Sequence, residues 1–501
     1  MSDDTAPKEA NVTSSKVDSK KQDAAGKYLQ DHADNAAADS VDLKKLRAKI
    51  DWNIVPLMFL CYFLQFIDKV IINYAGVMGI RDEINLVGND FSNAATVFFI
   101  AYLVFEVPNT LLLQKVPAGK WLGANVFLWG VVTAATAAVK NYPTLVVARV
   151  FLGIFEATIG PSLMIISSQY YTKAEQPSRF SIWYTGLGVG QILGGLISFG
   201  FQHVSPTAPL SGWRIMFIVL GLFTCLIGAL TAIFIPDTPM NARFLSEAEK
   251  VALLRHISSN KTGVWNRKFD PKQIIEALLD PQVYLLTLQV VLQSVSSGVV
   301  TTYSSTLIKN MGFTPKQAAL LNMPSGIVSI FFTVLVGFGI RSTSHRWAWI
   351  FMCSIPGIIG GGLMSFLPSS NKAGCLIGVY LVNAIVAPLP VVYHWTAANC
   401  AGHTKRSFAS ALVAGSFSVG NIIGPQTFQA KDAPEYRPAK IAVLATQAAA
   451  AVVAAVLFGY YVWENRRRDR QKSADDSDSA SETTAWAGLT DRQNKSFRYV
   501  Y

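Results

Sequence analysis

Residues 115–121 read KVPAGKW, and the same spacing of basic residues and tryptophan returns 226 positions later in residues 341–347, which read RSTSHRW. The same offset carries Arg179 onto Lys405, so two independent landmarks agree. Agreement of two landmarks at one long offset is typical of internal duplication. The sequence therefore predicts a chain built from two related halves.

Long apolar runs flank both of these stretches. Of the 501 residues, 51% are hydrophobic and 15% are charged, against about 25% charged in a typical soluble protein. Because about 20 apolar residues cross a bilayer as a helix, the runs predict twelve membrane-spanning helices. They are expected near residues 53–75, 92–114, 121–139, 143–167, 179–202 and 213–235, and near 283–306, 317–340, 346–366, 374–396, 407–429 and 439–463.

The predicted fold class is an all-α membrane protein with twelve transmembrane helices in two six-helix halves, which is the major facilitator fold. Only 29 of the 75 charged residues lie outside residues 1–50, 236–282 and 464–501. This distribution predicts five regions. They are a disordered cytosolic N-terminal tail (1–50), an N-terminal half (51–235), a cytoplasmic linker (236–282), a C-terminal half (283–463) and a cytosolic C-terminal tail (464–501).

Basic residues cluster before the first span, in the central linker and after the last span. Lysine and arginine collect on the cytoplasmic side of spanning helices, so both termini and the linker are expected in the cytoplasm. The net charge of +11 then reflects membrane topology, and no nucleic-acid partner is expected. We expect a multi-pass protein that contacts the lipid bilayer and acts as a monomer.

Signatures of enzymes are absent from the sequence. It contains no HExxH zinc motif, no GxxxxGK phosphate loop and no GxSxG nucleophile elbow. The five cysteines have no paired or CxxC spacing, which indicates neither a disulfide framework nor a metal site. We therefore expect no enzymatic activity, no metal and no cofactor.

Ionisable side chains inside spans cost about 3 kcal/mol each, so each needs a partner or a water-filled cavity. Helical rise places Asp68 and Arg149 at one depth, and Glu106 and Glu156 together in the inner third. Asp68 and Arg149 could form a fixed structural ion pair. In the alternative, functional interpretation Asp68, Glu106 and Glu156 carry protons and Arg149 holds an anion.

Span seven is unusually polar, which is typical of a helix that lines a cavity. We expect Gly298 to interrupt this helix, although many of its polar side chains could merely bond their own backbone. Together with three ionisable residues of other spans, its side chains complete the predicted substrate-binding set. That set is Lys69, Arg149, Gln293, Ser297, Tyr303 and His394.

Several motifs resemble those of the fungal allantoate permease group, the anion:cation symporter branch of the major facilitator superfamily. The resemblance covers residues 50–465 and rests on the following stretches: FEVPN at 105–109, RVFLGIFEA at 149–157, GWR at 212–214, IPDTP at 235–239, ARFL at 242–245, NCAGHTKRS at 399–407 and GNIIGPQTF at 420–428.

This resemblance implies proton-coupled uptake of a small organic anion, vitamin, sulfur or nitrogen compound across the fungal plasma membrane. Substrates across the group include allantoate, nicotinate, pantothenate and biotin. The superfamily has a signature in the loop between the second and third spans, and this chain keeps only its last pair, Gly119 and Lys120. This departure weakens a gating role for the loop. Gln191 stands where the antiporter signature has proline, so proton-antiport export is a less favoured alternative. A nutrient sensor that does not transport is the third.

Overall fold

The computed structural model describes residues 41–501 apart from 114, 173–174, 206, 259–269, 344, 369, 475–489 and 495–496, together with residues 28, 29, 31, 32, 38 and 40. Most of the N-terminal tail predicted to be disordered lies outside these residues. Within them the regular elements are all helical, and no β-strand occurs. The all-α part of the predicted fold class is thereby confirmed.

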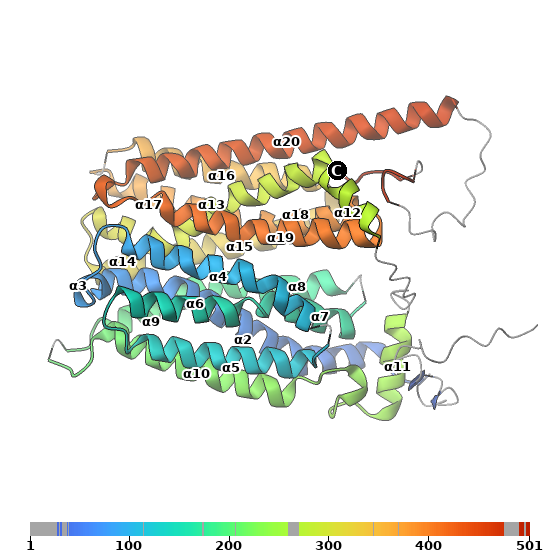
Figure 1. The fold of residues 1–501 in the computed structure, drawn as a ribbon, viewed down its shortest axis with the longest axis horizontal. Coiled ribbons are helices and arrows are strands. Elements are labelled where there is room, and N and C mark those ends of the chain that lie inside the picture. Colours follow the sequence, from blue (N-terminus) through green and yellow to red (C-terminus); the bar gives the residue numbers. More distant parts are fainter. Residues whose placement is uncertain are drawn as a thin grey trace, which may run out of the picture.

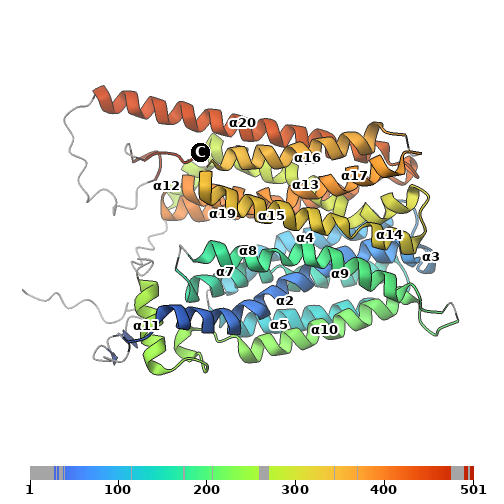
Figure 2. The ribbon, with the colours of Figure 1, turned by 180° about the vertical axis from the view of Figure 1, so that it is seen from behind.

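The N-terminal half packs as one group of helices beside the C-terminal half (Figures 1 and 2). Its helices are α2 (Leu43–Met78), α3 (Ile80–Glu83), α4 (Asp90–Leu112), α5 (Ala118–Thr136), α6 (Tyr142–Glu156), α7 (Ile159–Tyr170), α8 (Gln176–Tyr184), α9 (Gly186–Phe201) and α10 (Gly212–Phe234).

The central linker and the C-terminal half follow. The linker contributes η3 (Pro239–Asn241), α11 (Glu247–Ser258) and α12 (Pro271–Leu278). The C-terminal half contains α13 (Pro281–Asn310), α14 (Pro315–Leu321), α15 (Pro324–Thr343), α16 (Arg346–Phe366), α17 (Lys372–Val382), η4 (Asn383–Val386), α18 (Pro388–Asn399), α19 (His403–Gln426), η5 (Ala430–Asp432) and α20 (Arg437–Ala474). We call the end of the molecule that carries α11 and α12 the linker end, and the other the opposite end (Figure 1).

Eleven helical segments of the described chain are long and apolar enough to cross a membrane. The remaining predicted span corresponds to α5, which is less apolar but runs alongside α10 (Figure 1). Glycines make this contact close: a Cβ added at Gly123 would lie 2.6 Å from the Cβ of Ala232. Small residues that let helix backbones approach are a common basis of helix association in membranes. Close packing against α10 therefore explains why α5 lies within the helix bundle, although its sequence is less apolar than that of the eleven other segments.

Prolines shape the longer spans. The eighth and tenth predicted spans each consist of more than one helix, and α15 begins at Pro324 while α18 begins at Pro388. Proline has no N–H to donate and suits the first turn of a helix, so it favours a new helix at these points. The expected interruption at Gly298 is wrong, because α13 is continuous through it. A Cβ there would lie 3.1 Å from the Cα of Asn421 on α19, so this glycine permits close packing.

Large apolar side chains remain exposed on the outside of the helix bundle. Ile233 and Phe234 of α10 are 67% and 60% exposed, and Phe338 of α15 is 71% exposed. Contiguous exposed apolar surface marks contact with a membrane or a partner. On helices of this length and composition the lipid bilayer is the expected contact.

Candidate functional site

A cavity of about 1110 Å³ lies between the two halves. Helices α2, α4, α7 and α8, with the start of α9, supply its wall from the N-terminal half, and α13, α18 and α19, with the short η4, supply it from the C-terminal half. It extends to Thr110 of α4, Thr287 of α13 and Ser407 of α19, which lie toward the linker end of their helices. Four predicted site residues line it: Lys69, Glu106, Gln293 and Ser297.

One side of the cavity is an aromatic wall made by α2 and α8. The ring of Trp183 meets the ring of Phe180 with centroids 4.3 Å apart and that of Tyr62 at 4.7 Å. Tyr184 completes the group, with its ring stacked on Phe180 at 5.3 Å. Aromatic faces can pack on apolar and flat parts of a ligand and attract cations. This wall therefore offers contact area, but no charge.

Positive charge on the cavity wall comes from Lys69 of α2. Its Nζ lies 2.9 Å from Oε1 of Glu156, which is fully buried on α6. The ammonium also lies 5.4 Å from the ring centroid of Tyr102 and 5.9 Å from that of Phe417. Lys69 is thus held by one carboxylate behind it and two rings beside it, with its side chain 13% exposed. The common depth expected for Glu106 and Glu156 stays a prediction; Glu106 lines the same cavity as Lys69.

The Lys69–Glu156 pair provides a stability prediction. Removal of one partner from a buried ion pair costs about 3 to 5 kcal/mol, whereas removal of both can be nearly neutral. We expect Glu156→Gln to lower the unfolding temperature in detergent and Glu156→Gln with Lys69→Met to recover most of the loss. Glu106→Gln is the matched control, because Glu106 has no ion-pair partner among the described residues. An unchanged unfolding temperature in Glu156→Gln would contradict the pair's role.

Asp68 and Arg149 lie behind the cavity wall, not on it. They are 4% and 2% exposed, respectively. Thr133 of α5 donates a hydrogen bond of 2.8 Å to Oδ1 of Asp68. Nε and Nη2 of Arg149 have no hydrogen-bond partner in the described chain, and no ion pair joins the two residues there. The fixed pair considered from the sequence is therefore not formed, although both groups are buried as expected.

Contacts between the halves close the opposite end. Asn73 of α2 donates to Oγ of Ser304 on α13 at 2.8 Å and accepts from the N–H of Ser305 at 3.1 Å. Nearby, Ser92 of α4 shares a hydrogen bond with the hydroxyl of Tyr303. The Tyr303 ring stacks on Phe428 with centroids 4.0 Å apart. The structure thus places Tyr303 in this closure and outside the cavity.

A second layer of contacts lies next to that closure. Nδ2 of Asn89 donates to the side chain of Gln429 at 2.7 Å, and Nε2 of Gln426 donates to Oγ1 of Thr96 at 2.8 Å. Polar side chains at the start of α4 and the end of α19 therefore meet directly across the boundary between the halves. Because these contacts close the opposite end, the cavity in the described part of the chain extends only toward the linker end.

His394, like Arg149 and Tyr303, is a predicted binding residue that does not line the cavity; it lies on an exposed part of α18. Its neighbour Tyr393 lines the cavity instead. The sequence interpretation also missed Gln65 and Tyr62, which line the cavity four and seven residues before Lys69. This spacing keeps residues on one helix face, so the position of Lys69 could have indicated them.

Comparison with known proteins agrees with this architecture. The family model described as Major Facilitator Superfamily matches residues 58–425. The chain is 38% identical to the thiamine pathway transporter THI73 of Saccharomyces cerevisiae, over 91% of this chain and 86% of that protein. It is 32% identical to the allantoate permease of the same yeast, over 94% and 91% of the two chains.

Solved structures share the fold. A crystal structure of a bacterial homolog to the human lysosomal transporter Spinster, in an inward-facing and unoccupied conformation, superposes with a TM-score of 0.61. It is 18% identical, and the match covers 81% of this chain and 95% of that one. At this identity the likeness shows the fold alone.

Proposed function

The chain belongs to the major facilitator superfamily, and on that basis we propose that it is a transporter that takes up a small organic anion together with protons. Its fold and relatives are those of transporters, which are not enzymes. The observation that carries the proposal is the position of Lys69 on the wall of the cavity, paired with the buried carboxylate of Glu156.

The charges around the cavity support an anionic substrate. Lys69 and Glu106 are the charged side chains among the residues that line it in the described chain. An anion that approaches Lys69 competes with Glu156 for the ammonium, and protonation of Glu156 would release Lys69 for the substrate. Binding of anion and proton would then favour each other, which is the requirement of symport. The aromatic wall would hold the uncharged part of the substrate.

Residues behind and beside this pair have roles in the same proposal. Asp68 and Glu156 are the proposed buried proton carriers, and Glu106 is a carrier exposed to the cavity. Arg149 stabilises the ionised form of the buried carboxylates. Gln293 has both amide atoms buried and unpaired in the described chain and lines the cavity, so it is a proposed hydrogen-bonding partner of the substrate.

The proposed setting is the fungal plasma membrane, with the linker end and both termini in the cytoplasm. The basic clusters beside the spans support this orientation. In it, the cavity extends toward the cytoplasm and the Asn73–Ser304 contact closes the outer side. The names of the relatives, a thiamine pathway transporter and an allantoate permease, direct the substrate search to vitamins and nitrogen compounds.

Transport measurements test the proposal. We expect a yeast strain that lacks its own permeases, and expresses this chain, to take up at least one member of a panel of labelled allantoate, nicotinate, pantothenate, biotin and organic sulfur anions. Uptake should rise as external pH falls from about 7 to about 5, because the inward proton gradient that would drive symport grows as the external proton concentration rises. A protonophore should abolish accumulation.

The empty vector and a Lys69→Met chain serve as controls. Uptake unaffected by both pH and protonophore would contradict proton coupling. A cell content that falls below the vector control under a proton gradient would instead indicate proton-antiport export, the alternative that the glutamine at Gln191 disfavours.

A further inference from the structure

Residues 490–494 and 497–501 lie across the linker end of the C-terminal half. Their main chain is bound by side chains of α18: Nε1 of Trp395 and Nδ2 of Asn399 donate to the carbonyl oxygen of Val500 at 2.7 and 2.9 Å. Oδ1 of Asn399 accepts from the N–H of Val500 at 2.8 Å. The N–H of Arg346 on α16 donates to the carbonyl oxygen of Tyr501 at 2.8 Å. This segment is therefore docked by its backbone as well as by its side chains.

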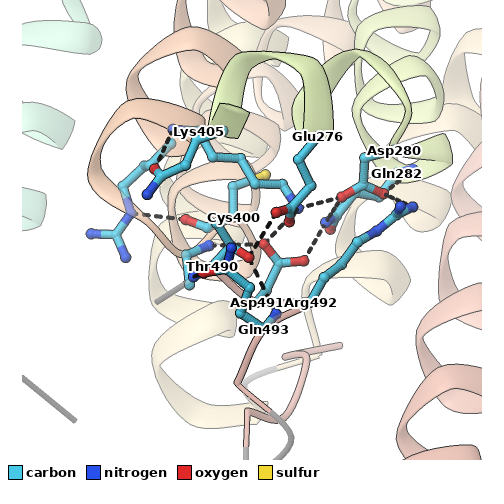
Figure 3. A network of polar contacts seen from close by, with 12 residues as sticks. Glu276, Asp280, Gln282, Cys400, Lys405, Thr490, Asp491, Arg492 and Gln493 are labelled. Atoms are coloured by element: carbon cyan, nitrogen blue, oxygen red, sulfur yellow. Dashed lines mark hydrogen bonds and ion pairs between the residues drawn. The ribbon is translucent and has the colours of Figure 1, made fainter. Parts of the chain in front are cut away.

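Asp491 is the centre of the docked segment, as Figure 3 shows. It is fully buried, and four donors converge on its carboxylate. Oδ1 lies 2.7 Å from Nζ of Lys405 and accepts from the N–H of Ala401 at 3.3 Å. Oδ2 accepts from Nε2 of Gln282 at 3.0 Å and from the hydroxyl of Tyr499 at 2.8 Å. An asparagine here would turn its NH₂ group toward two of these donors.

Lys405 of α19 has the complementary arrangement. Its side chain is fully buried, and its Nζ lies 3.0 Å from Glu276 of α12, 2.6 Å from Asp280 at the start of α13 and 2.7 Å from Asp491. An ammonium group carries three N–H donors, and three carboxylates surround it. Asp491 supplies the third, so without the docked segment one donor of a buried charge loses its partner.

Helix α20 binds the other side of the segment. Asn465 donates to the carbonyl oxygen of Tyr499 and accepts from its N–H, both at 2.9 Å. The Tyr499 ring stacks on Tyr461 with centroids 5.1 Å apart, and the Arg468 guanidinium lies 4.6 Å from the ring centroid. Burial and the neighbouring Asp491 raise the pKa of Tyr499 above its ordinary value, so its hydroxyl stays a donor.

The segment therefore joins α12, α13, α16, α18, α19 and α20 at one end, and α13, α18 and α19 are the C-terminal helices that line the cavity. The N-terminal half has a related pair at its own linker end: Arg179 of α8 lies 2.6 Å from Asp51 of α2. Arg179 and Asp51 connect the fifth predicted span of the N-terminal half to its first, and Lys405 and Asp280 make the same connection in the C-terminal half. Alternating access requires each half to move as a body. A segment that follows the last span of each half contacts its linker end: α11 pairs with α2 through Glu249 and Lys49 at 2.8 Å, and the docked C-terminal segment places a buried carboxylate in the C-terminal half.

We propose that residues 490–494 and 497–501 form a positioning element of transport, which docks at the linker end of the C-terminal half and holds α13 and α18 at a fixed distance there. Asp491 is its central residue. It acts through Lys405 and does not contact the cavity, so its effect is on the movement of the half and not on substrate recognition.

A synthetic peptide of residues 490–501 tests this directly on the chain truncated after residue 489. We expect saturable binding of the peptide by fluorescence anisotropy, and binding at least about tenfold weaker for the Asp491→Asn peptide, because hydrogen bonds to charged groups are the strong ones. An Arg498→Gln peptide is the matched control. Arg498 pairs with Asp469, whose side chain is 64% exposed, so its binding should stay within about twofold of the unmodified peptide.

Spin labels measure the positioning itself and need no substrate, so this result is independent of the proposed transport activity. Labels on Tyr284→Cys and Ala397→Cys, both exposed, report the distance between α13 and α18; Cys225→Ser removes the half-buried cysteine, since the other four are buried. We expect a narrow distance distribution in the full chain, a broader one after truncation and a narrow one again when the peptide is added.

The full-length Asp491→Asn chain repeats the test in a protein of unchanged length and should also broaden the distribution. An unchanged distribution in both altered chains would overturn the proposal. Equal narrowing by the unmodified and Asp491→Asn peptides would overturn the role of Asp491.

Discussion

Arg149→Lys is expected to reduce transport below about a tenth of the wild-type rate while the protein reaches the membrane in normal amount, because lysine keeps the charge but loses the planar fork of the guanidinium. Arg149 is buried, and its Nε and Nη2 make no hydrogen bond in the described chain. Its position behind the cavity wall favours a role toward Asp68 and Glu156 over direct contact with substrate. The measurement is initial uptake of the identified anion, normalised to surface expression.

The matched control is Arg437→Lys, the same substitution at an exposed position where α20 begins. This chain should transport at the wild-type rate. Near-normal uptake by Arg149→Lys would refute the proposed role of the guanidinium. Poor expression of Arg149→Lys alone would show that the arginine is needed for folding, which would also contradict the prediction.

The spans could be predicted from the sequence because membrane insertion depends on the length and composition of apolar runs. Their ends could not. Helix α2 begins at Leu43, ten residues before the predicted span, because Asp42 caps it by accepting from the N–H groups of Lys44 and Lys45. Capping hydrogen bonds determine where a helix begins and ends, whereas apolar composition indicates only the part of the helix that lies in lipid. The predicted boundaries of the tails and the linker stay predictions. Helix α20 continues past residue 463, the predicted end of the last span, to Ala474.

The candidate site could be predicted in its residue types but not in its pairings. Depth along a helix follows from its rise, so the sequence predicts one depth for Asp68 and Arg149, and the structure buries both side chains. Which face of a helix meets which neighbour depends on packing, and this decided that Glu156 pairs with Lys69. The same limitation explains why Tyr303 was expected in the cavity. It lies on the polar span seven, but its ring packs on Phe428 where the opposite end is closed.

The docked C-terminal segment was invisible for a related reason. Residues 464–501 are polar and charged in composition, which predicts a solvated tail. The buried carboxylate of Asp491 accepts from Lys405, Ala401 and Gln282, which lie far away in the sequence, and from Tyr499 of the same segment. Composition averages over such a segment, whereas docking depends on a few of its residues and on their partners elsewhere in the chain.

Asp68→Asn should separate two roles of this carboxyl group. A carboxamide cannot release a proton, but it has nearly the same volume and can still accept the hydrogen bond from Thr133, which measures 2.8 Å in the wild-type chain. If Asp68 is a proton carrier, the variant should fold, bind and exchange substrate across the membrane without accumulating it. The measurement is counterflow of labelled substrate in proteoliposomes, beside accumulation driven by a proton gradient.

The structural role predicts a different pair of results. If the charge of Asp68 mainly balances Arg149, its removal leaves a buried cation without its compensating charge, at a cost of about 3 to 5 kcal/mol. The protein would then be obtained in low yield, melt early in detergent and fail in both assays. Asp82→Asn, the same change at an exposed position of α3, should be normal in every measurement. Retained counterflow with lost accumulation supports the carrier, and a destabilised chain inactive in both assays rejects it. The absence of an ion pair between Asp68 and Arg149 in the described chain makes the first result the expected one, because little direct pairing is lost when the carboxylate is neutralised.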